Sequence, residues 1–225
     1  MGSGNAQQLE AEVWSHLDRG DTRTAIDLCE RLNRGHPEFA SGWHTASQLA
    51  LRLGNAEMAL DAIRQALRLE SDSSQWLLQE ARCLSKLGRA GAARAVVRRL
   101  EKQVLETPYE NATLGMVLTE LDERDKALAC YQAAVELAPD DPRQHYNVAC
   151  LQRTLGKLEA AEKSFDRCIE LDPADSDAWK LRSDLRRQTS EYNHVAELEA
   201  ALDRGAKDPM GEANLCYALA KELED

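Results

Sequence analysis

The chain has 225 residues, a formal net charge of −11 and an isoelectric point of about 5.0. This acidic balance argues against nucleic acid as a partner, because nucleic-acid binders usually present a basic surface. No apolar stretch is long enough to span a membrane, and no run of alternating β-branched residues predicts a strand.

An interval of 34 residues (59 − 25 = 34) recurs from the first helix pair to the last. Small apolar residues and one valine stand at this interval: Ala25, Ala59, Ala93, Ala127, Ala161 and Val195. Twelve residues before each of them lies another modest side chain: Val13, Ser47, Ala81, Gly115, Ala149 and Ser183. A turn residue separates the two series: Gly20, Gly54, Gly88, Asp122, Gly156 and Ser190. A period of this length indicates a stack of identical supersecondary units.

Each unit reads as two amphipathic helices joined by a tight turn, for which glycine tolerates a positive φ. Small residues on facing helices let the two backbones approach closely. Each pair leaves an apolar face uncovered, so neighbouring pairs must stack. We therefore predict one all-α domain over residues 1–225. Its helix pairs span about 6–39, 40–73, 74–107, 108–141, 142–175 and 176–208, and a terminal helix spans about 209–225.

The fifth unit carries the most specific pattern, with His145-Tyr146-Asn147-Val148-Ala149 followed by Gly156, Ala161, Phe165 and Pro173. This pattern resembles the tetratricopeptide repeat (TPR) family, and the resemblance covers nearly the whole chain. It implies a right-handed α-solenoid superhelix of antiparallel helix pairs, with a concave groove that binds proteins. Glu12 and Arg182 replace a usual leucine in the first and sixth units, as expected of end repeats that face water.

The last residues read as the first helix of a seventh repeat. Two interpretations are open: a terminal cap on repeat six, or a longer natural chain interrupted at this point, which we favour. The segment Glu197–Asp225 also resembles the junction in bacterial proteins that place a TPR array before a sulfotransferase domain. If that resemblance holds, the catalytic domain lies beyond residue 225.

Helical periodicity places one set of side chains on the groove face of the first helices. The candidate binding residues are Arg52, Arg82, Lys86, Tyr109, Met116, Arg143, Tyr146, Asn147 and Lys180. The arginines and Lys86 form a cationic strip suited to an acidic segment, or else are solvated charges paired with Glu80 or Glu120. Tyr109, Met116 and Tyr146 form an apolar shelf for a partner or pack between repeats. Asn147 hydrogen-bonds an extended peptide or is simply a polar surface residue.

The lysine and asparagine set with which some TPR co-chaperones clamp a chaperone's C-terminal carboxylate is absent from any three successive repeats. The repeat before Asn147, for example, carries Ala112 and Met116 in place of that pair. We also find no nucleophile with a base, no paired carboxylates and no metal-ligand spacing, which predicts neither catalysis nor a cofactor. The six cysteines form no C-x-x-C pair and read as reduced thiols of a cytoplasmic protein, with a redox or metal role as the alternative.

Two functions follow from this pattern. The first is a non-catalytic scaffold that binds a peptide or protein segment in the concave groove. The alternative is the N-terminal TPR region of a larger bacterial enzyme. The sequence leaves the partner's identity and the oligomeric state open.

Overall fold

The computed structural model describes residues 2–225, with side chains described from residue 4. Within these residues every regular element is a helix, and the only β-type contact is an isolated bridge between Thr189 and Tyr192. The all-α prediction is therefore confirmed. The chain forms two compact units, one ending at Leu105 and the other running from Glu106 to Asp225, and each is described by itself.

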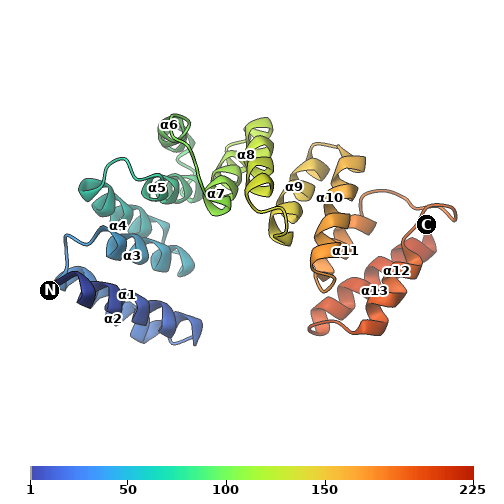
Figure 1. The fold of residues 1–225 in the computed structure, drawn as a ribbon, viewed down its shortest axis with the longest axis horizontal. Helices are drawn as coiled ribbons and strands as arrows, with labels where there is room; N and C mark the ends of the chain where they lie inside the picture. The colour runs from blue at the N-terminus through green and yellow to red at the C-terminus, as the bar shows by residue number, and fades with distance from the viewer. Residues whose placement is uncertain (1) are drawn as a thin grey trace. The chain divides into compact units, whose positions relative to one another are not determined.

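The first unit is a stack of antiparallel helix pairs, drawn from blue to green in Figure 1. The first helix of each pair packs on its second helix, which in turn packs on the first helix of the next pair. The helices are α1 (Gly2–Asp18), α2 (Thr22–Gly35), α3 (Ala40–Arg52), α4 (Ala56–Leu69), α5 (Ser74–Lys86) and α6 (Ala90–Leu100).

The second unit begins with the same arrangement, in which α7 packs on α8, α8 on α9, and α9 on α10. Its first helix starts with a capping box, in which Thr107 and Glu110 each accept a hydrogen bond from the other's backbone N–H. The helices are α7 (Pro108–Glu120), α8 (Arg124–Leu137), α9 (Pro142–Thr154), α10 (Leu158–Leu171), α11 (Ser176–Ser183), α12 (Val195–Arg204) and α13 (Pro209–Glu224).

The turns inside the first five pairs are left-handed at the residue that the period singles out. Gly54 has a φ of 77°, and glycines 20, 88 and 156 share this conformation. The fourth pair carries Asp122 at this place, with a φ of 62°, the one described non-glycine residue with a positive φ. Aspartate tolerates this region better than most residues do, which explains how the period survives without glycine.

The seam of each pair is the point where the two backbones come closest. The alanines at the repeated position, from Ala25 to Ala161, are completely buried. The residues that precede them by twelve, such as Ala81 and Ala149, are buried too. In the fourth pair a Cβ added to Gly115 would lie 2.9 Å from the ring of Tyr131, so only glycine fits there.

The sixth pair departs from the predicted register. Val195 is the first residue of α12 and is half-buried, whereas Leu198 is the fourth residue of α12 and completely buried, as Ala161 is in α10. The interval is therefore 37 residues (198 − 161 = 37), three more than predicted. Ser190 is not in a left-handed turn, because residues 184–194 form a longer non-helical loop.

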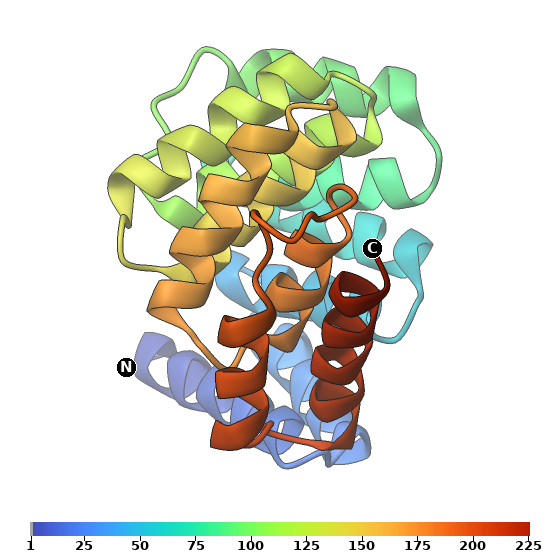
Figure 2. The same cartoon turned by 90° about the vertical axis from the view of Figure 1, so that its right-hand side faces the viewer.

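The same displacement of three recurs between the first helices. Ser47 on α3 lies 3.7 Å from the Sγ of Cys83, 36 residues later, whereas Ser183 on α11 donates a 2.5 Å hydrogen bond to Glu222, 39 residues later. Helix α13 packs on both α11 and α12, and Figure 2 shows α12 and α13 side by side as an antiparallel pair. A three-residue insertion in the loop thus accounts for both changes.

Candidate functional site

The first helices of the first unit form a continuous face, because α3 contacts both α1 and α5. We call this surface the first-helix face; it is built from α1, α3 and α5. Glu10 on α1 ties it together by accepting 2.6 Å hydrogen bonds from the hydroxyls of Ser41 and Thr45 on α3. Both bonds reach the same carboxylate oxygen, Oε1, and they fix the register of neighbouring repeats.

A buried aromatic contact joins α3 to α5. The rings of His44 and Trp76 lie 4.5 Å apart, and His44 is only 6% exposed. Burial, with a smaller contribution from the charge of Arg82, lowers the pKa of His44 to about 4. His44 is therefore neutral at physiological pH and serves as an aromatic spacer rather than a charge.

Arg82 on α5 is positioned without a carboxylate. Its Nη1 donates to Gln79 Oε1 over 3.3 Å, and Gln79 in turn donates to the Ser47 hydroxyl over 3.0 Å. The Nε of Arg82 is buried and has no hydrogen-bond partner. Glu80, which the sequence offered as a partner for this charge, instead pairs with Arg64 at 3.3 Å. The Arg82 guanidinium is thus half-buried and held in place by Gln79, and no carboxylate forms an ion pair with it. We call such a group uncompensated.

Arg52, at the end of α3, adds a second guanidinium to the first-helix face. It is exposed and lies 5.7 Å from the ring centroid of Trp14 on α1, a cation–π distance. Among the described residues, neither Arg52 nor Arg82 forms an ion pair. Lys86, also exposed, follows Arg82 by one helical turn. The structure therefore brings these three predicted residues onto neighbouring helices.

Arg143 and Lys180 lie in the second unit, and each is occupied locally. Arg143 binds Asp141 through two hydrogen bonds of 2.9 and 2.8 Å, and these bonds lower the pKa of Asp141 to about 2. Lys180 pairs with Asp184 at 2.7 Å and lies 4.9 Å from the ring centroid of Tyr217. Both side chains have a carboxylate partner, so neither offers the uncompensated charge that Arg82 does.

The three residues of the predicted apolar shelf differ in their exposure. Tyr109, on α7, is 53% exposed. Met116 is half-buried on the same helix. Tyr146, on α9, is half-buried and meets Phe165 edge-on at 6.0 Å, and burial raises its pKa. Tyr146 therefore contributes to packing within its own helix pair, while Tyr109 is the most accessible of the three. Asn147 is half-buried beside Tyr146.

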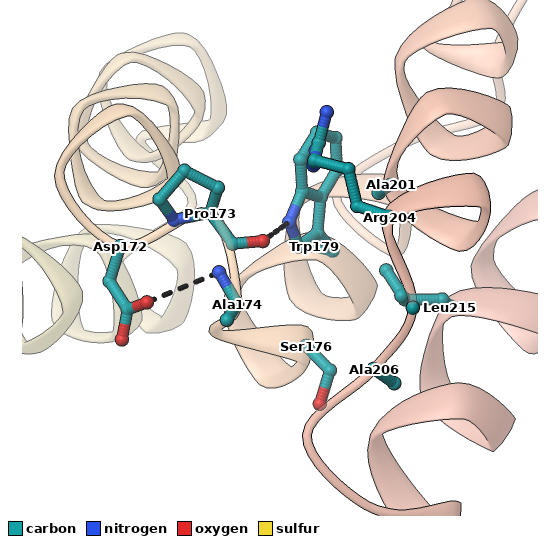
Figure 3. A pocket seen from close by; sticks show the side chains of 10 residues that line it. Asp172, Pro173, Ala174, Ser176, Trp179, Ala201, Arg204, Ala206 and Leu215 are labelled. Atoms are coloured by element: carbon teal, nitrogen blue, oxygen red, sulfur yellow. Dashed lines mark hydrogen bonds between the residues drawn. The ribbon is translucent and has the colours of Figure 1, made fainter.

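A small pocket in the second unit was not predicted (Figure 3). It has a volume of about 190 Å³ and lies between the chain link that precedes α11 and the link that precedes α13. Trp179 forms one wall, with its indole N–H donating to the carbonyl of Pro173 over 3.1 Å, and Arg204 and Leu215 lie on the other side. The helices of the sixth pair supply part of the pocket lining. In the sequence, Ser190 in place of the turn glycine and Glu199 in place of an apolar residue four positions after Val195 were the signals that this pair differs.

The described residues include no group of three or more histidine, cysteine or acidic side chains arranged to hold a metal ion. Burial raises the pKa of the thiols of Cys29 and Cys83 to about 11, so both are protonated and unreactive at neutral pH. None of the described helices has the length and apolarity required to cross a lipid bilayer.

Sequence profiles described as tetratricopeptide repeat match residues 44–104 and 114–186. Among curated proteins, Hsp70-Hsp90 organizing protein 3 of Arabidopsis thaliana is 23% identical over 185 residues, which are 81% of this chain and 33% of that protein. The human DnaJ homolog subfamily C member 7 is 28% identical over 170 residues, 70% of this chain and 33% of its own length. The chain thus spans about a third of these relatives.

Solved structures of similar fold include PilW, a widely conserved type IV pilus biogenesis factor, with a TM-score of 0.72 and 16% identity. That match covers 97% of this chain and 94% of PilW. The pilF protein of Pseudomonas aeruginosa matches with a TM-score of 0.69 and 16% identity, over 100% of this chain and 98% of pilF. Identities this low compare the fold alone.

Proposed function

Because the chain belongs to the tetratricopeptide repeat family, we propose that it is a non-catalytic scaffold that binds a protein segment along its first-helix face. Curated relatives that are named as chaperone organizing proteins support a protein partner in general.

The observation that carries the proposal is the pair of uncompensated guanidiniums, Arg52 and Arg82. In a chain with a net charge of −11, carboxylates are abundant, yet these two arginines are held by an aromatic ring and an amide instead. The buried, unpartnered Nε of Arg82 has given up water without gaining an acceptor.

The ligand chemistry that fits is an extended segment carrying Asp or Glu. Arginine binds carboxylates through charge-assisted, often bidentate hydrogen bonds, which contribute about 1.5–3 kcal/mol each when they form away from water. The buried rings of His44 and Trp76 pack α3 against α5 and so hold together the two helices that carry Arg52 and Arg82. Such a surface selects an acidic segment and repels a basic one.

A chaperone C-terminal tail is not the segment we propose, although the curated relatives include Hsp70-Hsp90 organizing proteins. The chain lacks the lysine and asparagine set that holds such a tail, as the residues of the repeat before Asn147 illustrate. We expect C-terminal peptides of Hsp70 and Hsp90 to bind no better than scrambled peptides of the same composition, measured by fluorescence anisotropy.

A charge-reversal experiment tests the proposal. The probe is a labelled peptide of alternating glutamate and glycine, titrated against the wild type and against the double variant Arg52→Glu/Arg82→Glu. The matched control, Arg68→Glu/Arg98→Glu, changes the net charge equally on exposed residues of α4 and α6. We expect the first variant to lose binding about tenfold or more, since each lost contact to a charge is worth about 1.5–3 kcal/mol. Equal losses in both variants would mean that only net charge matters and would refute the site.

A further inference from the structure

The pocket beside Trp179 exists because α12 is short. Helix α12 has 10 residues, whereas α10, its counterpart in the preceding pair, has 14. Gly205 follows α12 with a φ of 83°, which ends the helix, and Gly205 and Ala206 line the pocket in place of a further helical turn. Leu215 of α13 closes the pocket on another side, so the pocket lies between neighbouring elements within the second unit.

The walls of this pocket are largely apolar. Trp179, Ala201 and Leu215 are buried residues that line it, and Pro173 lies beside the indole of Trp179 (Figure 3). The volume of about 190 Å³ exceeds the roughly 150 Å³ of an apolar cavity that holds benzene in another protein. The pocket therefore has room for one aromatic ring or one branched alkyl group.

The polar side chains around the pocket offer donors rather than unused acceptors. The carboxylate of Asp172 accepts a 3.1 Å hydrogen bond from the backbone N–H of Ala174 and pairs with Lys207 at 3.1 Å. The hydroxyl of Ser176 accepts a hydrogen bond from the Asn214 amide over 3.4 Å, and its own O–H donates to no described residue. A cationic occupant would therefore find no unpaired carboxylate in the pocket.

Charge selects an anion. Among the described residues, every carboxylate that lines the pocket or the wider cleft beside it is ion-paired. The pairs are Asp172–Lys207, Asp166–Arg182, Glu197–Arg182 and Glu170–Arg167. Arg204 lines both spaces and is exposed, and it has no ion-pair partner in the described part of the chain. Arginine binds carboxylates through charge-assisted, often bidentate hydrogen bonds, so a carboxylate complements this charge.

We propose that the pocket beside Trp179 binds a carboxylate that is attached, within a few bonds, to an aromatic ring or a branched alkyl group. The apolar group fills the pocket, and the carboxylate accepts hydrogen bonds from Arg204. The two parts must be close together because Arg204 itself lines the pocket. Two sources share this chemistry: an apolar C-terminal residue of a protein, and a free aryl or alkyl carboxylic acid. The site uses no residue of the first-helix face.

Small probes separate the charge from the apolar group. N-acetyl-phenylalanine mimics a C-terminal residue, and hydrocinnamate is a free acid with the same ring. The amide of N-acetyl-phenylalanine lacks the carboxylate, and N-acetyl-glycine lacks the ring. In calorimetric titrations of the whole protein, we expect the two acids with a ring to bind with dissociation constants of roughly 0.1–1 mM. The other two probes should bind about tenfold more weakly or not at all.

Protein variants locate the contact. Arg204→Gln should weaken binding of both acids with a ring by about tenfold or more, because it removes the charge that the carboxylate meets. Arg153→Gln, a matched change of an exposed arginine on α9 in the same unit, should leave their binding unchanged. Ala206→Leu should abolish binding with Arg204 intact, because the larger side chain fills the pocket. Circular dichroism verifies that each variant is folded.

Three outcomes overturn the proposal: no saturable binding of either acid with a ring up to about 10 mM, equal binding of N-acetyl-phenylalanine and its amide, and equal losses in Arg204→Gln and Arg153→Gln. The two acids also distinguish the sources. Binding of N-acetyl-phenylalanine that is at least about threefold tighter than that of hydrocinnamate assigns the pocket to a protein C-terminus, and any other order assigns it to a free acid. The variant Arg52→Glu/Arg82→Glu should bind both acids normally, so this proposal and the scaffold proposal succeed or fail independently.

Discussion

Replacing Gly115 by alanine tests the seam of the helix pairs most sharply. A Cβ at this position would lie 2.9 Å from both Cδ1 and Cε1 of the Tyr131 ring, closer than real Cβ atoms approach. Overpacking of this kind costs about 1–3 kcal/mol. Alanine also raises helix propensity relative to glycine by about 1 kcal/mol, which offsets part of the loss. We expect Gly115→Ala to lower the free energy of unfolding by about 0–2 kcal/mol, the difference between these two effects.

The matched control is Gly91→Ala on α6, where an added Cβ meets nothing within 4 Å. This variant gains helix propensity without a clash and should be stabilised by about 0.5–1 kcal/mol. Urea unfolding followed by circular dichroism measures both variants, and the difference between them isolates the steric cost. Tyr131→Leu should rescue Gly115→Ala, whereas Tyr131→Phe should not, because the ring carbons make the contact. Equal behaviour of the two glycine variants would refute close approach at the seam.

Two further predictions concern the sixth pair. Leu198→Ala should lower the free energy of unfolding by about 2–5 kcal/mol, because Leu198 is completely buried. Val195→Ala should lower it clearly less, because Val195 is only half-buried. Thermal unfolding of the two variants decides whether position 195 or position 198 corresponds to the buried alanines of the other pairs. The second prediction is a pH dependence at Glu222. Burial alone would raise the pKa of this carboxyl, but hydrogen bonds from His194 and Ser183 outweigh it and hold the pKa at about 2, against 4.5 ordinarily. The folded state therefore binds fewer protons, so stability falls as the pH drops from about 4.5 towards 2, and Glu222→Gln should make that fall shallower in urea titrations at each pH. An unchanged slope in Glu222→Gln would contradict the assigned hydrogen bonds.

The fold was predictable because its determinants are local and repeated. A buried alanine such as Ala127, a small partner such as Gly115 and a left-handed turn such as Asp122 lie within one 34-residue window, and each recurs in register. The sixth pair was mispredicted because Val195 satisfies the same small-apolar criterion as the alanines. Only the placement of α12 shows that Leu198 is the residue buried at the seam.

The types of residue in the candidate site were predictable from the sequence. Which of its charged side chains form ion pairs was less predictable. Helical spacing predicts that Arg82 and Lys86 share one face, and both residues lie on α5. Whether a charge is compensated depends on neighbours that spacing does not reveal. Arg143 forms an ion pair with Asp141, two residues earlier in the chain. Glu80 forms an ion pair with Arg64 and not with Arg82. The contact between Arg52 and Trp14 joins different repeats and follows only from their stacking.

The most direct test of the scaffold proposal is photo-cross-linking from the first-helix face in cells that express the protein. A photoreactive residue replaces Gln48 on α3 or, as the control, Arg68 on the exposed side of α4. Mass spectrometry of the products identifies the cross-linked segment. We predict an Asp- and Glu-rich protein segment joined to position 48, absent at position 68 and lost in Arg52→Glu/Arg82→Glu. Cross-links of equal yield at both positions, or yields at position 48 that survive the charge reversal, would contradict the proposal.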